Sequence, residues 1–262
     1  MLPWCLSALL LLHAAPGIAK IIQIETQTSV TVSDGIVKVE VAATNKGDEP
    51  ARNVRAHVAL LGKSCTHRGK DLLREGESMT VSFGKIPSPA KPGTYPLITR
   101  ITFQDVKGHP FSAVSCTTFP TGEGFASGLK CRGKAVSFTR DGLLKFTVTN
   151  RGATSRTIRA TLVLPEEFST HIPQRELSID PRAKEAILFE ISNFSALVGA
   201  VYPVFCYLEY DSGKAHYTEA AKSLVSIVAS DNWFRRARVL WLCLAIITGV
   251  ILVACQFKRK SA

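Results

Sequence analysis

Apolar and polar residues alternate with a period of two along much of this chain, as in Val37-Lys38-Val39-Glu40-Val41 and Leu144-Lys145-Phe146-Thr147-Val148. This period is typical of strands that bury one face. Gly, Pro, Asn and Asp interrupt the pattern at short spacing, and no part of residues 20–230 shows a sustained helical period. We therefore expect an all-β protein, with strands near 21–32, 36–45, 53–61, 77–86, 94–104 and 110–118, and again near 127–138, 143–150, 156–164, 175–180, 183–191, 201–210 and 215–228.

The same landmarks occur twice in the same order, about 105 residues apart, which indicates a duplicated domain. The matching motifs are Thr44-Asn45-Lys46-Gly47 with Thr149-Asn150-Arg151-Gly152, Gly93-Thr94-Tyr95-Pro96 with Gly199-Ala200-Val201-Tyr202-Pro203, and Asp105–Gly108 with Asp211–Gly213. We expect the first motif to be the turn after the second strand, where Asn and Gly tolerate positive φ, and the third to be a hairpin turn. About seven strands per copy predict two tandem immunoglobulin-like β-sandwiches, at 20–119 and 129–230, joined by a linker at 120–128.

This series of strand, TNKG or TNRG, strand, G-x-YP, strand and D-x-x-G turn resembles bacterial Ig-like domains of the CARDB or NEW3 type, over about 200 residues. The resemblance implies an adhesive, spacing or accessory module of the cell envelope. A second resemblance is to the luminal domains of translocon-associated proteins, which join a similar sandwich to one membrane span but usually carry a single sandwich. The ending Lys258-Arg259-Lys260-Ser261-Ala262 is similar to a dilysine retrieval signal.

Residues 239–257 form a nineteen-residue segment without charge, in which only Thr248 and Gln256 are polar. As a helix it would span about 28 Å, close to the ~30 Å hydrocarbon core of a bilayer. Basic residues border it on both sides, so we expect a C-terminal transmembrane helix followed by a cytoplasmic tail at 258–262. A buried core helix is the alternative.

The run Leu6–Leu12 is apolar but too short to span a membrane, and small residues follow it at Gly17 and Ala19. This pattern predicts a cleaved signal peptide at 1–19. An uncleaved signal anchor is the alternative, because residues 1–5 contain no Lys or Arg. The predicted signal peptide places residues 20–234 outside the cytoplasm, in a periplasm, at a cell surface or, alternatively, in the lumen of the endoplasmic reticulum.

The net charge of +11 does not indicate a nucleic-acid-binding protein. Six of the basic residues border the apolar segment 239–257, which leaves 26 Lys and Arg against 21 Asp and Glu in residues 20–234. No basic stripe with interleaved aromatic residues is present, so we expect no nucleic-acid partner.

Four cysteines, Cys65, Cys116, Cys131 and Cys206, fall within the two copies. An even number outside the cytoplasm is consistent with disulfides, and we favour the pairs 65–116 and 131–206. Buried thiols are the alternative. Asn193-Phe194-Ser195 is an N-glycosylation sequon, relevant in a host that glycosylates.

The sequence contains no C-x-x-C, H-E-x-x-H or G-x-S-x-G motif, and its six histidines are scattered. We therefore expect no enzymatic activity and no cofactor. The stretch 63–70 is basic, and Lys63, Arg68 and Lys70 are candidates to contact an acidic protein or glycan; a solvated loop is the alternative. The expected function is that of a membrane-anchored binding or scaffold protein, with a translocon-associated component and an accessory module of a surface hydrolase as alternatives.

Overall fold

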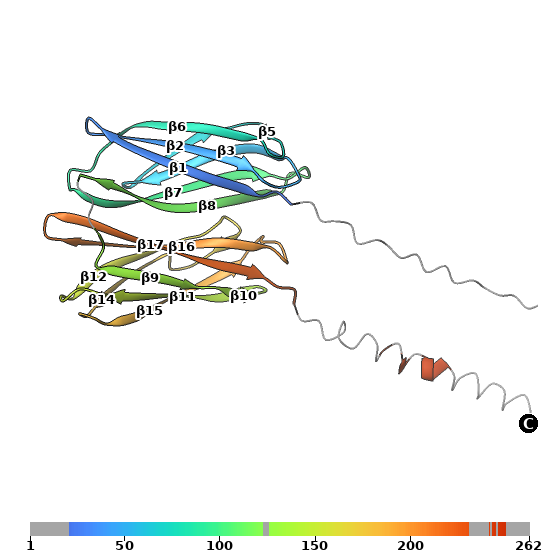
Figure 1. Cartoon of the computed structure of the whole chain (residues 1–262). Coiled ribbons are helices and arrows are strands. Elements are labelled where there is room, and N and C mark those ends of the chain that lie inside the picture. Colours follow the sequence, from blue (N-terminus) through green and yellow to red (C-terminus); the bar gives the residue numbers. More distant parts are fainter. Residues whose placement is uncertain (1–20, 123–125, 231–240, 242, 245, 250–262) are drawn as a thin grey trace, which may run out of the picture. The chain divides into compact units, whose positions relative to one another are not determined.

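The computed structural model describes residues 21–122, 126–230, 241, 243–244 and 246–249 (Figure 1). The fold of this part is all-β, as the alternating pattern predicted. The predicted signal peptide at 1–19, the tail at 258–262 and much of the segment 239–257 lie outside the described residues. Those residues of 241–249 that are described are helical, and no helix within the described part of the chain has the length and apolarity needed to cross a bilayer.

The chain forms two compact units. Unit 1 comprises residues up to Ser127 together with Tyr207–Ala220, and unit 2 comprises Gly128–Cys206 and the residues from Ala221 onward. The boundary at 127/128 falls inside the predicted linker. The assignment of 207–220 to unit 1 was not expected from the sequence, because these residues lie within the second copy of the repeat.

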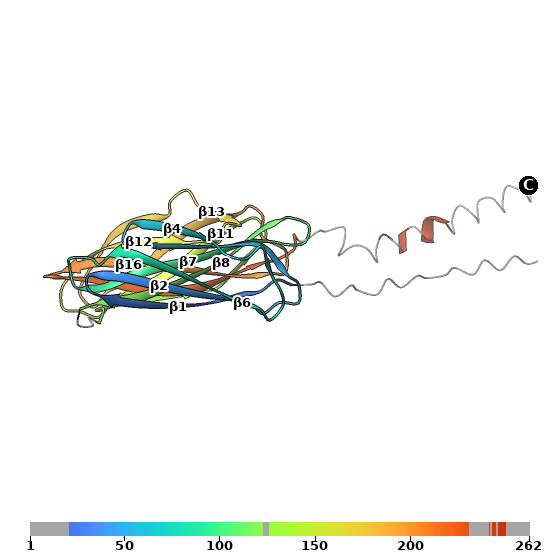
Figure 2. The ribbon, with the colours of Figure 1, turned by 90° about the horizontal axis from the view of Figure 1, so that it is seen from above.

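Unit 1 contains two facing sheets. One has the order β1-β2-β6, with β1 at Ile24–Ser33, β2 at Ile36–Asn45 and β6 at Ser78–Pro87. The other has the order β8-β7-β3-β4, with β5 also paired to β3; the bounds are β3 Ala51–Leu60, β4 Lys63–Arg68, β5 Leu72–Leu73, β7 Gly93–Gln104 and β8 Pro110–Thr121. The strands of both sheets run along roughly the same axis (Figure 2). Their inward residues form one core, which includes Val39, Val41, Val58, Phe83 and Ile101.

Unit 2 repeats this arrangement. One sheet has the order β13-β15-β11-β9, with β9 at Leu129–Lys134, β11 at Asp141–Asn150, β13 at Phe168–Ser169 and β15 at Lys184–Asn193. The other has the order β14-β12-β16-β17, with β10 beside β17; the bounds are β10 Val136–Phe138, β12 Arg156–Val163, β14 Gln174–Ile179, β16 Val201–Ser212 and β17 Ala215–Ile227. The second half of β16 and the first half of β17 fall within 207–220 and so count with unit 1. Phe146 and Phe189 are fully buried and meet edge to face, with ring centroids 6.3 Å apart.

The Thr-Asn-Lys/Arg-Gly motif has a different role from the one expected. None of Asn45, Gly47, Asn150 and Gly152 has positive φ. Instead, the Asn45 side chain is fully buried, donates to the carbonyls of Glu49 (2.8 Å) and Leu73 (3.2 Å), and accepts from Gly47 N (3.0 Å). The motif is therefore a buried amide that ties three pieces of backbone together.

Asn150 makes the same contacts in unit 2. Its amide nitrogen donates to the carbonyls of Thr154 (2.9 Å) and Ile179 (3.1 Å), and its oxygen accepts from Gly152 N (2.9 Å). Gly47 has a further reason to be glycine, because a Cβ there would lie 2.1 Å from the carbonyl oxygen of Ile21. The repeated motif is thus explained by packing and hydrogen bonding within each unit.

The Tyr-Pro motif is also structural in both copies. The Tyr95 hydroxyl donates to the carbonyl of Lys91 (2.7 Å), four residues upstream, and the Tyr202 hydroxyl accepts from Leu197 N (3.0 Å), five residues upstream. Each tyrosine lies near the start of a long strand, β7 or β16, and fixes the chain that leads into it. Burial raises the pKa of both phenols, so they are neutral donors and acceptors near neutral pH.

Candidate functional site

The predicted contact residues lie on and beside an edge strand. Lys63 and Arg68 are the two ends of β4, and Lys70 follows it, so most of the stretch expected to be a loop is in fact a strand. β4 ends its sheet, pairs only with β3 among the described strands, and is exposed at every position except the partly buried Cys65. Such an edge leaves a row of backbone N–H and C=O groups available to a partner.

Neighbouring carboxylates neutralise part of the basic charge near β4. Arg68 Nη2 lies 2.7 Å from Asp71 Oδ1, and Lys70 Nζ lies 2.5 Å from Glu77 Oε1. The hydrogen bond from Lys70 is the largest cause of a lowered pKa at Glu77. Lys63 makes no ion pair with a described residue, so it and the outer face of Arg68 carry the positive charge that a partner would meet.

A cluster of charged and aromatic side chains surrounds His216 in unit 1. The ring stacks on Tyr95, with centroids 4.5 Å apart and planes inclined by 15°. Its Nδ1 lies 2.8 Å from Asp211 Oδ1, and its Nε2 lies 3.4 Å from Glu209 Oε1. Lys91 Nζ completes the cluster at 3.0 Å from Asp211 Oδ2. Two carboxylates therefore face one imidazole.

Backbone contacts hold His216 in this position. Its N–H donates to the carbonyl of Pro92 (2.9 Å), and its Cα is paired with that of Gly93. A Cβ at Gly93 would lie 2.0 Å from the His216 carbonyl oxygen, so only glycine permits this approach. The Thr218 hydroxyl adds a bond to the carbonyl of Thr94 (2.8 Å).

The hairpin turns of the two copies share an Asp–His pair. In the first copy, Asp105 accepts from the backbone N–H groups of Lys107 and His109 and lies 3.0 Å from the His109 ring. The His109 side chain is 66% exposed, whereas that of His216 is 16% exposed. The turn chemistry is shared, but the packed cluster occurs only in the second of these two turns.

The carboxylates make His216 easier to protonate. The nearby Glu209 carboxylate is the largest cause of a raised pKa at His216; burial opposes it, and the hydrogen bond to Asp211 adds to it. In turn, the hydrogen bond from His216 and the contact with Lys91 lower the pKa of Asp211. The ion pair between Asp211 and His216 therefore contributes its full stability above the ordinary Asp value of 3.8 and below the ordinary His value of 6.5.

The contribution of His216 to stability should therefore be lost as pH rises through its raised folded-state pKa. We expect His216→Gln to lower the urea midpoint of unit 1 relative to the parent chain more at about pH 5.5 than at about pH 8. His109→Gln is the control, because that exposed pair should show little difference between the two pH values. Equal effects of His216→Gln at both pH values would contradict the ion cluster.

The cysteine pairing 65–116 is wrong. Along the sheet, Cys65 pairs with Val58, Val58 with Thr99, and Ile98, beside Thr99, with Cys116. Three strand spacings separate the two cysteines, about 14 Å, whereas a disulfide needs Cα atoms within ~7 Å. Burial, followed by the Glu209 charge, raises the pKa of Cys116 to about 12, so this thiol is protonated at neutral pH.

The pair 131–206 is not formed either. Cys131 lies on β9 and Cys206 on β16, in the two facing sheets of unit 2, and both are buried without a disulfide. Cysteine thiols pack well in a core as small apolar groups. The alternative of buried thiols therefore fits this pair.

The Asn193 side chain has a structural role. Its amide nitrogen donates to the carbonyls of Thr139 (3.1 Å) and Ala196 (3.2 Å), and its oxygen accepts from Ala196 N (2.7 Å). A glycan on this nitrogen would remove at least one of these bonds. Glycosylation of the sequon stays a prediction.

Within the described ranges, no group of three or more His, Cys, Asp and Glu side chains is placed to hold a metal ion. The cluster at His216 can instead bind or release a proton and hold two segments of unit 1 together.

No protein-family model and no curated protein matches this chain. Among solved structures, red sea bream transglutaminase is similar over 78% of this chain and 31% of its own, with 11% identity and a TM-score of 0.27. Escherichia coli alpha-2-macroglobulin activated by porcine elastase is similar over 82% of this chain and 23% of its own, with 9% identity and a TM-score of 0.32. The trypsin-activated form of Escherichia coli alpha-2-macroglobulin is similar over 79% of this chain and 18% of its own, with 10% identity and a TM-score of 0.31. This chain spans less than a third of the length of each, and likenesses this weak carry no argument about function.

Proposed function

We propose that this chain is a single-pass membrane protein that presents two immunoglobulin-like sandwiches outside the cytoplasm and acts by binding rather than by catalysis. The uncharged segment 239–257, with basic residues on both sides, supports the membrane attachment. The resemblance to envelope modules of the CARDB or NEW3 type supports a location in a periplasm or at a cell surface.

The immunoglobulin-like assignment is supported by features that each unit has separately. Both contain two facing sheets of mainly antiparallel strands around an apolar core. Tyr95 and Tyr202 each bond through the hydroxyl to backbone a few residues upstream, which is similar to the tyrosine corner of immunoglobulin-like domains. We accordingly treat unit 1 and unit 2 as two copies of such a sandwich.

The observation that carries the binding proposal is the exposed basic edge strand β4. It combines unpaired edge backbone with the side chains of Lys63, His67 and Arg68. Edge strands with these features accept an extended segment of another protein, and the basic side chains favour an acidic one. Because Asp71 and Glu77 neutralise part of the charge, the attraction is modest and depends on salt.

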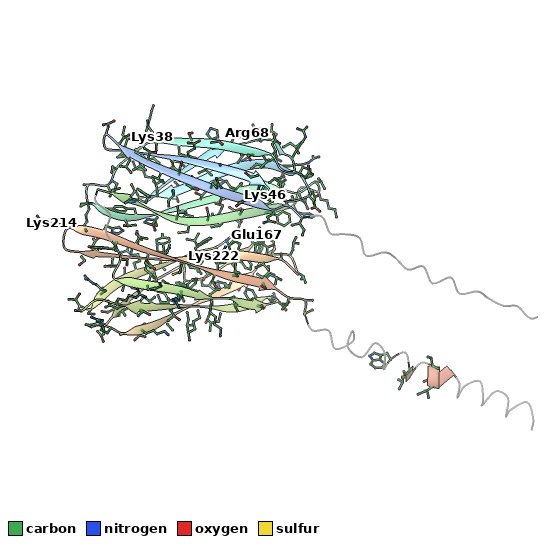
Figure 3. All side chains as sticks on the ribbon, viewed as in Figure 1. Lys38, Lys46, Arg68, Glu167, Lys214 and Lys222 are labelled. Carbon is green, nitrogen blue, oxygen red and sulfur yellow. The ribbon has the colours of Figure 1, made fainter. Side chains whose placement is uncertain are left out.

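Charge reversal on β4 should weaken binding to acidic probes. We expect the full chain in detergent with Lys63→Glu and Arg68→Glu to bind polyglutamate and heparin about tenfold more weakly than the parent chain at low salt, with the difference shrinking near physiological salt. The matched control reverses Lys38 and Lys46, which are also exposed in unit 1 but lie on and just after β2 (Figure 3).

An equal loss in the control variant would mean that net charge, and not β4, governs retention. Unchanged binding by the β4 variant would overturn the proposed contact surface.

A further inference from the structure

Unit 2 exposes an apolar surface at the connection between β15 and β16. Phe194 is 83% exposed, and Leu197, Val198 and Val201 are each more than half exposed. The connection, residues 194–200, contains no charged residue. A soluble protein seldom places four large apolar side chains in eight residues on its surface unless something covers them. We call this segment, residues 194–201, the apolar loop.

Hydrogen bonds hold the apolar loop in a defined shape. Gly199 N donates to the carbonyl of Ile227 (2.7 Å), and Ile227 N donates to the carbonyl of Ala200 (3.1 Å). Asn193 bonds through its side chain to both the N–H and the carbonyl of Ala196. The apolar side chains are therefore presented outward by a fixed backbone and do not fold back onto unit 2.

These bonds also place the apolar loop beside the end of β17, where the chain leaves unit 2. Val228, the next residue after β17, is itself 45% exposed and continues the apolar surface. The segment 239–257 begins eleven positions later in the sequence. Even a fully extended connection spans only about 36 Å, and a flexible one averages about 20 Å. The apolar loop is thus at the end of unit 2 that the anchor keeps near the bilayer.

The opposite end of unit 2 has a different character. β11 runs from Asp141, which pairs with Ser192 beside the apolar loop, to Asn150 at the Thr-Asn-Arg-Gly motif, a distance of about 30 Å. The exposed residues at that motif include Arg151, Ala153 and Thr154. Among residues 128–230, the four most exposed large apolar side chains therefore lie in the apolar loop, at the end from which the chain continues to its apolar segment.

The intervening sequence contains Trp233 and Phe234 and then Arg235, Arg236 and Arg238. Aromatic and basic residues of this kind are enriched at the boundary between lipid and water. We propose that the apolar loop inserts into the lipid interface of the membrane that holds 239–257, with Phe194 entering deepest. This inference rests on the membrane attachment proposed above. It gives unit 2 a second, shallow contact with the bilayer, which limits its tilt relative to the anchor.

Fluorescence quenching by brominated lipid tests the insertion on the full chain. In a background with Trp4, Trp233 and Trp241 replaced by Phe, one variant carries Phe194→Trp and its control carries Ala153→Trp at the opposite end of unit 2. Each is reconstituted as one chain per nanodisc, with or without brominated acyl chains. Insertion of about 5–10 Å should quench the Phe194→Trp signal by about half and shift it to the blue, with the control unaffected.

The outcomes separate the two proposals. Protein that fails to stay with the discs in alkaline carbonate overturns both the anchor and the insertion. Protein that stays with the discs while Phe194→Trp is no more quenched than Ala153→Trp overturns the insertion alone. A blue shift that grows with protein concentration and comes without quenching would show that a second copy of the chain covers the apolar loop. That result also overturns the insertion. Val198→Trp, in the same loop, gives an independent second reading.

Discussion

Replacing Asn150 by Ala is expected to lower the free energy of unfolding of unit 2 by about 3 kcal/mol, because buried backbone groups would lose their partners. The Asn150 side chain is 1% exposed, and its amide satisfies the carbonyls of Thr154 and Ile179 and the N–H of Gly152. The alanine variant leaves these groups without a replacement partner at the site. Asn45→Ala should have the same effect on unit 1, because its contacts are equivalent.

Urea-dependent pulse proteolysis of the full chain in detergent, with fragments identified by mass, measures the two units separately. With a typical slope of about 2 kcal/mol per molar urea, the midpoint of unit 2 should fall by about 1.5 M in Asn150→Ala. Ser155→Ala is the matched control, because its exposed hydroxyl bonds to Ser178 in the same region and its loss should cost under about 1 kcal/mol. A midpoint for Asn150→Ala that equals the control would contradict the structural role of the motif.

Replacing Gly93 by Ala is expected to cost unit 1 about 3 kcal/mol or more, since two unfavourable effects combine. Gly93 has φ of 152°, which side chains rarely adopt, and a Cβ would lie 2.0 Å from the His216 carbonyl oxygen and 2.7 Å from its nitrogen. Because these are backbone atoms, the clash is relieved only if 207–220 moves away. The variant should therefore also lose the stacking of His216 on Tyr95 and the pH dependence that follows from it.

Gly84→Ala is the control for this substitution. Gly84 lies in β6, its φ is outside the left-handed range, and an added Cβ there meets nothing within 4 Å. Backbone hydrogen exchange of 207–220 should rise in Gly93→Ala and stay unchanged in Gly84→Ala. Protection of 207–220 that is the same in both variants would mean that the close approach of Gly93 and His216 does not hold this segment.

The positions of the long strands followed from the alternating pattern, because one face of each is buried in a core. The same pattern missed β4, whose residues are exposed on both faces and so carry no apolar period. The sequence identified Asn45 and Asn150 as repeated but assigned them to turn conformation. Their true partners include Leu73 and Ile179, which are distant in the sequence, so only the folded chain reveals the buried amide.

The predicted cysteine pairing was wrong for a related reason. A pairing of Cys65 with Cys116 assumes that their strands are neighbours, whereas the order β8-β7-β3-β4 puts two strands between them. The equivalence of His109 and His216 was visible in the sequence, since both follow an aspartate turn. The packing of His216 against Tyr95 and Glu209 could not be seen in the sequence, because it depends on the assignment of 207–220 to unit 1.

Protease accessibility in oriented membranes tests the proposed membrane topology most directly. Added protease should digest residues 20–234 on intact cells or spheroplasts, while sealed inverted vesicles should protect them until detergent is added. A cytoplasmic marker reports that each preparation is sealed. Digestion from the outer face is the predicted result; full protection in sealed, intact cells or spheroplasts, with digestion in inverted vesicles, would contradict the account.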